Sequence, residues 1–138
     1  MMKQIMLGAA TLLSVAASGA HALADGEKEL GPDAVLLTGG DLAAALTDVK
    51  AEGWAFDGSD WFYFTEHYMP DGSIVGVGGP VDGSSKWQWS GNWRAEAEQA
   101  CFDYPDLGSG ACRAIYVENG VYKNVDGSDV RAHWQPMQ

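Results

Sequence analysis

The sequence predicts a small all-β protein: an antiparallel barrel with one short N-terminal helix and one disulfide. Apolar and polar residues alternate with a period of two through much of the chain after Trp54. Turn signals rich in Gly, Asp and Asn recur at intervals of roughly 8–12 residues, as in β meanders, sandwiches and barrels. Only two cysteines are present, and both lie in the alternating region. Together these features favour roughly six to eight antiparallel strands.

The first 24 residues predict a secretory signal peptide. Lys3 supplies a positive start, residues 5–17 are apolar and small, and both Ala20-His21-Ala22 and Ala22-Leu23-Ala24 fit a cleavage site. The apolar run is shorter than the roughly 20 residues of a spanning helix. No cysteine directly follows it for lipid attachment. We expect cleavage after Ala24 or Ala22, a periplasmic or secreted location, and no membrane attachment afterwards.

The remainder predicts one acidic domain. The chain has 19 Asp and Glu against 8 Lys and Arg, a net charge of −11, and the loss of Lys3 on cleavage makes the mature domain more negative still. Such a surface repels nucleic acid and anionic lipid, so neither is an expected partner. Six Trp, five Tyr and four Phe supply material for a folded core. We expect residues 25–35 to be a flexible lead-in and residues 36–138 to form a single barrel domain.

One short helix is expected at the start of this domain. Apolar residues recur there at helical spacing, namely Leu42, Ala45, Leu46 and Val49. Thr38 or Asp41 can cap the start of the helix, and Gly53 can end it.

The strands follow in order. Residues 61–68 predict a strand that is aromatic on both faces, and Met69-Pro-Asp-Gly72 predicts a turn into Ile74–Val77. The clearest alternation runs from Trp87 to Glu96, and it places Gln88, Ser90, Asn92 and Arg94 on the face that we expect to be exposed to solvent. Further strands are expected at 100–104, 112–117, 121–125 and 130–134, with hairpin turns at 119–120 and 126–127.

The two cysteines predict a structural disulfide. In an exported chain an even pair favours a bridge, and the spacing of Cys101 and Cys112 is not that of a redox motif. The bridge would clamp a hairpin at its base and contribute about 3 kcal/mol by the loop-entropy argument.

The order of these motifs resembles a known family. The motifs are Leu37-Thr-Gly-Gly-Asp-Leu, Tyr68-x-Pro-Asp-Gly-Ser, Ser90-Gly-Asn-Trp-Arg94, Cys101-Phe-Asp-Tyr and Cys112-Arg-Ala-Ile-Tyr. Over residues 36–127 the chain resembles small exported bacterial proteins classed as domain-of-unknown-function family 995. The resemblance implies a lipocalin-like barrel and export, and it implies no activity.

Five aromatic residues are the candidate ligand-binding set. Trp87, Trp89 and Trp93 share one strand face, and Trp61 and Tyr63 share another. A lipocalin-like barrel can hold one small apolar or aromatic ligand in its interior. The alternative is that these rings simply fill the core, and a smaller alternative is that they stack on sugar rings.

Metal binding is a further hypothesis. Two histidines each lie near a methionine, in the pairs His67 with Met69 and His133 with Met137. Imidazole and thioether ligands suit copper in an exported protein. Such residues also fall beside a turn and a chain end by chance, and the sequence otherwise predicts no cofactor.

No catalytic motif is present, so we expect a non-enzyme. The sequence lacks a nucleophile elbow, a His-Glu-x-x-His zinc motif and a phosphate loop. The expected function is therefore the binding of a small ligand or a protein partner. The size and charge also resemble those of acidic inhibitors of a basic secreted enzyme such as lysozyme, for which residues 83–86 offer an exposed loop.

Overall fold

The structure is a computed structural model that describes residues 28–80 and 83–137. The predicted signal peptide, and the lead-in as far as residue 27, lie outside the described residues. Within these residues, no helix has the length and apolar character needed to cross a bilayer.

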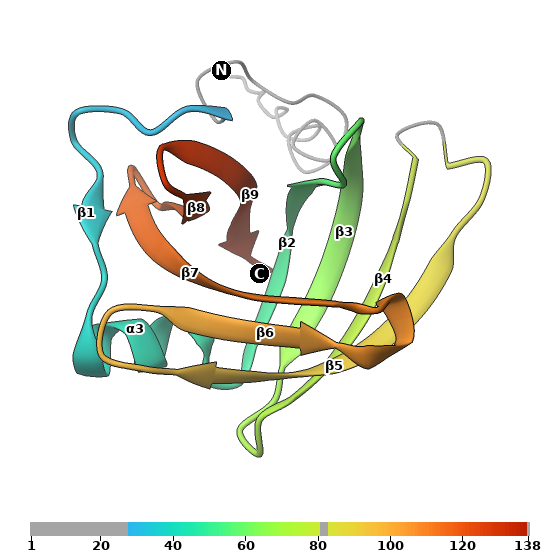
Figure 1. Cartoon of the computed structure of the whole chain (residues 1–138), viewed down its shortest axis with the longest axis horizontal. Helices are drawn as coiled ribbons and strands as arrows, with labels where there is room; N and C mark the ends of the chain where they lie inside the picture. The colour runs from blue at the N-terminus through green and yellow to red at the C-terminus, as the bar shows by residue number, and fades with distance from the viewer. Residues whose placement is uncertain (1–27, 81–82, 138) are drawn as a thin grey trace, which may run out of the picture.

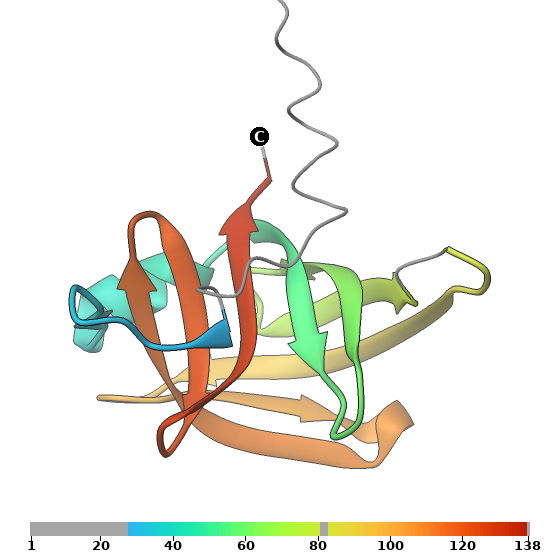
Figure 2. The ribbon, with the colours of Figure 1, turned by 90° about the horizontal axis from the view of Figure 1, so that it is seen from above.

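Eight antiparallel strands form a closed barrel (Figure 1, Figure 2). Each strand pairs with the next along the chain, and the last pairs with the first to complete the ring. The eight are β2 (Val49–Phe56), β3 (Trp61–Tyr68), β4 (Ser73–Gly79), β5 (Trp87–Ala95), β6 (Ala100–Tyr104), β7 (Ser109–Glu118), β8 (Val121–Asp126) and β9 (Asp129–Pro136). A two-residue strand, β1 (Val35–Leu36), pairs with β7. The predicted all-β barrel is confirmed.

Helix α3 (Gly39–Leu46) closes one end of the barrel. Leu42 and Leu46 are fully buried in the core, and the backbone N–H of Gly39 donates to the carbonyl of Ala97 in the β5–β6 turn. Figure 1 shows α3 beside the ends of β5 and β6. The barrel therefore has one plugged end and one end formed by the β2–β3, β4–β5, β6–β7 and β8–β9 connections.

The helix is shorter than its apolar spacing predicts. It ends at Leu46, Asp48 adopts a left-handed φ of 57°, and Val49 already belongs to β2. The expectation that Gly53 ends the helix is wrong, because Gly53 lies within β2. A Cβ at Gly53 would collide with the carbonyl of His133, so glycine there permits the close approach of β2 and β9 that closes the barrel.

The predicted β7–β8 turn and β6–β7 pairing are confirmed, whereas the β8–β9 turn lies at residues 127–128, one residue later than predicted, because Asp126 still pairs with Asp129. Asn119 and Gly120 have φ values of 53° and 81°, which is the left-handed pair that a two-residue β7–β8 turn requires. Cys101 and Cys112 lie directly opposite each other on β6 and β7 and form a disulfide with an S–S distance of 2.06 Å. Both strands of this hairpin are therefore covalently joined.

The first described residues pack on the outside of the barrel. The buried Lys123 donates from Nζ to the carbonyl of Glu29 at 2.6 Å and to Glu118 Oε1 at 2.9 Å. The backbone N–H of Gly31 donates to the same Glu118 oxygen at 3.1 Å. Some of the segment predicted to be a flexible lead-in is thus tied to β7 and β8.

Candidate functional site

The barrel interior is hollow towards the end opposite α3. A cavity of about 500 Å³ lies there, and its rim includes Asp57 from the β2–β3 turn and Leu107 from the short 3-10 helix η2 (Pro105–Leu107). This volume falls within the range of roughly 300–1,000 Å³ that is typical of small-molecule pockets. The other half of the interior is filled by the core that packs on α3.

Aromatic rings form one side of the cavity. They project from β3, β5 and β6, and they are Phe62, Phe64, Tyr68, Trp87, Trp89, Phe102 and Tyr104. Phe62 lies 5.7 Å from Trp87 and 6.3 Å from Trp89 between ring centroids, with the latter pair edge to face. Edge and face contacts of this kind suit an apolar or aromatic ligand.

A buried carboxylate lies among these rings. Glu66 is 7% exposed, and its two oxygens accept hydrogen bonds from Tyr68 Oη at 2.6 Å, Trp89 Nε1 at 2.8 Å and Tyr104 Oη at 3.3 Å. Burial raises the pKa of Glu66 above its ordinary value, while the three donors act in the opposite direction. Burial and the nearby Glu66 also raise the pKa values of Tyr68 and Tyr104.

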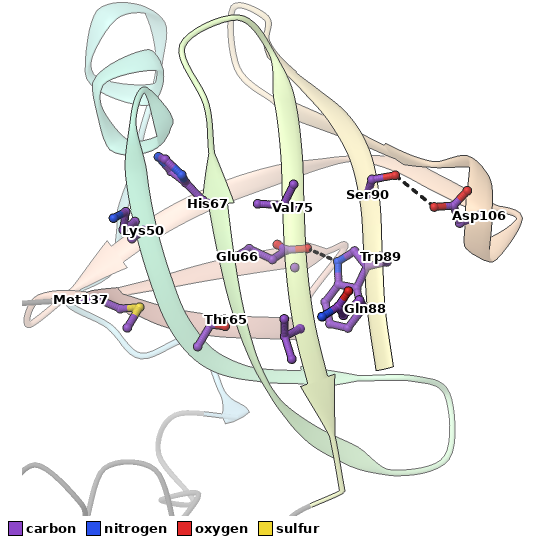
Figure 3. A pocket seen from close by; sticks show the side chains of 12 residues that line it. Lys50, Thr65, Glu66, His67, Val75, Gln88, Trp89, Ser90, Asp106 and Met137 are labelled. Atoms are coloured by element: carbon purple, nitrogen blue, oxygen red, sulfur yellow. Dashed lines mark hydrogen bonds between the residues drawn. The ribbon is translucent and has the colours of Figure 1, made fainter. Parts of the chain in front are cut away.

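Glycines on β4 make this network possible. Glu66 pairs with Gly76 on β4, and Gly76 pairs with Trp89 on β5, so the three residues form one row across the sheet. A Cβ at Gly76 would collide with the Trp89 indole, and one at Gly78 would lie 2.7 Å from its far edge. The indole therefore lies against bare backbone, with Nε1 directed at the carboxylate. Figure 3 shows this Glu66–Trp89 hydrogen bond crossing β4.

The opposite side of the cavity is more polar. It comprises Arg113 on β7, Asn124 on β8, and Arg131, Ala132 and Trp134 on β9. Asn124 pairs with Ala132, whereas Val125 pairs with Val130, so Arg131 is the extra residue of a β-bulge. Its guanidinium lies over the Phe56 ring, 5.2 Å from the centroid.

Two of the five predicted ligand-binding residues line the cavity. Trp89 is buried on the aromatic side, and Trp87 lies towards the mouth and is 40% exposed. Trp93 packs against the core instead, where its Nε1 donates to the carbonyl of Met69 at 2.9 Å.

The remaining two predicted residues face outwards. Trp61 lies beside Phe56 and His133, with ring centroids 5.5 and 5.8 Å away. Tyr63 donates from its hydroxyl to Glu52 at 2.7 Å, and burial, followed by that contact, raises its pKa to about 12. Neither residue lines the interior cavity, so the structure does not bring the five expected residues together, and only Trp87 and Trp89 of the five line it.

Sequence reasoning missed most of the cavity. Glu66 and Phe64 alternate with outward residues on a strand that is aromatic on both faces, so no pattern marked them as interior. The available signal was the pair of glycines two residues apart on β4, Gly76 and Gly78. Such a run indicates that a large side chain from a neighbouring strand covers the backbone.

An open groove lies on the outer face of β3, β4 and β5 (Figure 3). It is lined by outward residues that include Thr65, Val75 and Gln88. His67 and Met137, two of the four candidate copper ligands, also line it, and His67 Nε2 lies 2.8 Å from Asp48 Oδ1.

The other two candidate copper ligands lie elsewhere. Met69 Sδ accepts a hydrogen bond from the Ser73 hydroxyl. His133 is buried and pairs with Trp54 on β2, whereas His67 pairs with Lys50, four residues away on the same strand. The expected four-residue copper set is therefore not assembled. Among the described residues, one group of three metal-ligating side chains occurs, Glu96 with Cys101 and Cys112, and its two sulfurs are bonded to each other.

The chain matches no protein-family model, no curated protein and no solved structure in the comparisons. The resemblance to family 995 therefore stays a prediction.

Proposed function

We propose that this protein is an exported, non-enzymatic binding module that holds a small ligand with an apolar or aromatic body in the barrel interior. The observation that carries the proposal is the hollow half of the barrel, with aromatic rings on one side. If side chains filled the whole interior, these rings would be core residues with no space beside them for a ligand. The disulfide between Cys101 and Cys112 is compatible with an oxidising compartment outside the cytoplasm.

Rigidity of the cavity supports the same proposal. Its aromatic side is held by the Glu66 hydrogen bonds, and the adjoining β6–β7 hairpin is held by the disulfide. A preformed site binds with a smaller loss of conformational entropy than one that must be ordered by its ligand. No observation favours the lysozyme-inhibitor or copper hypotheses over this one.

The test is titration of the purified protein with N-phenyl-1-naphthylamine, a neutral probe that fluoresces in apolar surroundings. We expect saturable binding of one probe per chain. Ala132→Trp and Ala111→Phe, which place bulk inside the cavity, should each weaken binding by about tenfold or more.

The matched control is Val75→Trp, which adds a ring on the outer face where Val75 is 47% exposed. It should bind the probe like the parent protein. Circular dichroism and thermal unfolding identify which of the two filling variants is folded. Absence of saturable binding, or equal binding by a folded filling variant, would overturn the proposal.

A further inference from the structure

The cavity has two chemically different walls. β3, β5 and β6 supply the aromatic rings, whereas β7, β8 and β9 supply Arg113, Asn124 and Arg131. The three polar residues are close in the sheet: Ile115 pairs with Asn124, Asn124 pairs with Ala132, and Arg113 and Arg131 flank that row. Residues in diagonal register of this kind are within reach of one another when their side chains are long.

The two arginines of the cavity have no carboxylate partner among the described residues, although the protein is acidic. The chain has three arginines, and the third, Arg94, is exposed and pairs with Glu96 at 2.9 Å. Arg113 and Arg131 are half-buried, and within residues 28–80 and 83–137 neither has a carboxylate within 4.0 Å. A guanidinium that is partly withdrawn from water and lacks an anionic partner favours an anion supplied from outside.

The same wall holds further unused hydrogen-bonding atoms. Trp134 is 2% exposed, and its Nε1 has no hydrogen-bond partner among the described residues. The same holds for Asn124 Oδ1, on a side-chain amide that has both donor and acceptor groups. An indole N–H and two guanidinium groups are all donors, so this wall as a whole suits a ligand rich in acceptor oxygens.

The two carboxylates that line the cavity, Glu66 and Asp57, already accept hydrogen bonds from other groups of the protein. Glu66 receives its three hydrogen bonds on the aromatic side. Asp57 at the rim accepts from the backbone N–H groups of Ser59 and Asp60, both at 2.8 Å, within its own turn. Neither side chain is paired with Arg113 or Arg131.

We propose, as a deepening of the proposed function on which it rests, that the ligand is an amphipathic organic anion. Its aromatic or apolar body lies against Phe62, Phe64 and Trp89. Its carboxylate, sulfonate or phosphate group lies against Arg113 and Arg131. The β-bulge of β9 contributes to this selectivity because it places Arg131 at the cavity.

The experiment compares 8-anilino-1-naphthalenesulfonate with N-phenyl-1-naphthylamine, which has the same rings without the sulfonate. We expect the sulfonate probe to bind about tenfold more tightly, with an affinity that falls as salt is added. The double variant Arg113→Gln/Arg131→Gln should lose that preference, so that its ratio of sulfonate-probe affinity to neutral-probe affinity falls from about ten to about one. Lys50→Gln, which removes the same type of charge from the outer groove, should change neither affinity.

The outcomes separate the two proposals. If the neutral probe binds in the cavity but the sulfonate adds no affinity, or if the double variant retains the preference, the anion proposal is overturned and the binding module stands. If a folded filling variant such as Ala132→Trp or Ala111→Phe leaves binding of both probes unchanged, or if neither probe binds, both proposals fail.

Discussion

Glu66 on β3 accepts a 2.8 Å hydrogen bond from the indole of Trp89 on β5, across Gly76 on the strand between them. This contact joins the buried carboxylate of the cavity to one of its indole rings. It depends on the missing side chain at Gly76, because any Cβ there would occupy the position of the indole. The contact therefore links barrel stability to the shape of the cavity.

Removal of the carboxylate should destabilise the barrel. Glu66→Ala leaves the donors of Tyr68, Trp89 and Tyr104 without an acceptor in a buried site, and we expect a loss of about 2–4 kcal/mol in the free energy of unfolding. Glu66→Gln retains a carbonyl oxygen and removes the buried charge, so its loss should be smaller. Urea unfolding at pH 7 measures both variants, and equal stability of Glu66→Ala and the parent protein would contradict the network.

The same residue should give stability a distinctive pH dependence. Burial raises the pKa of Glu66, so the folded state retains a proton that the unfolded state has released. Its contribution to stability is largest below the unfolded pKa and is lost as pH rises through the folded pKa. Subtraction of the Glu66→Gln curve from the parent curve should show this decline, and a difference that rises with pH would contradict the assignment.

A methyl group at Gly76 should displace Trp89. Gly76→Ala is expected to cost about 1–3 kcal/mol through overpacking and to shift the tryptophan emission. Gly40→Ala is the matched control, because a Cβ there has no neighbour within 4 Å and alanine favours the helix. The control should be neutral or more stable by up to about 1 kcal/mol, and similar losses in both variants would argue against a specific role of Gly76.

His133 should make the protein less stable as the pH falls. Burial, followed by the charge of Lys123, lowers the pKa of His133 to about 4, so the folded state disfavours its protonation. The unfolded state binds that proton at about pH 6.5, and the free energy of unfolding should fall by an amount on the order of 2 kcal/mol between those pH values.

The comparison is best made in a Glu66→Gln background, because Glu66 gives a slope of the opposite sign. Adding His133→Asn to that background should flatten the curve between pH 4 and 6.5, the window set by the lowered and ordinary pKa values. Parallel curves for the single and double variants would exclude His133 as the source.

The disulfide should stabilise the domain without contributing to the cavity lining. Replacement of both Cys101 and Cys112 by serine is expected to lower the free energy of unfolding by about 3 kcal/mol through the entropy of the opened loop. Because neither cysteine lines the cavity, a folded double variant should still bind the neutral probe. Unaltered stability on chemical denaturation would contradict this structural role.

Local patterns predicted the strands well. The expected bounds of 61–68 and 100–104 coincide with β3 and β6, because period-two alternation and turn chemistry act within a few residues. The helix end was missed because Val49 fits both the apolar spacing of a helix and the first position of β2. The prediction that Gly53 ends the helix failed for a related reason. Gly53 is needed for the close contact between β2 and β9, and β9 is distant in the sequence.

The sequence by itself determined the all-β class, the order of the strands after residue 60, the hairpin turns and the partnership of the two cysteines, because each depends on neighbours along the chain. Only the tertiary structure decided which face of β3 is interior. On β3 both faces are aromatic, so closure of β9 onto β2 places Glu66 inside and leaves Tyr63 outside. Closure also brings Arg113 and Arg131 to the same cavity as Trp89, since a barrel joins walls that are far apart in the sequence.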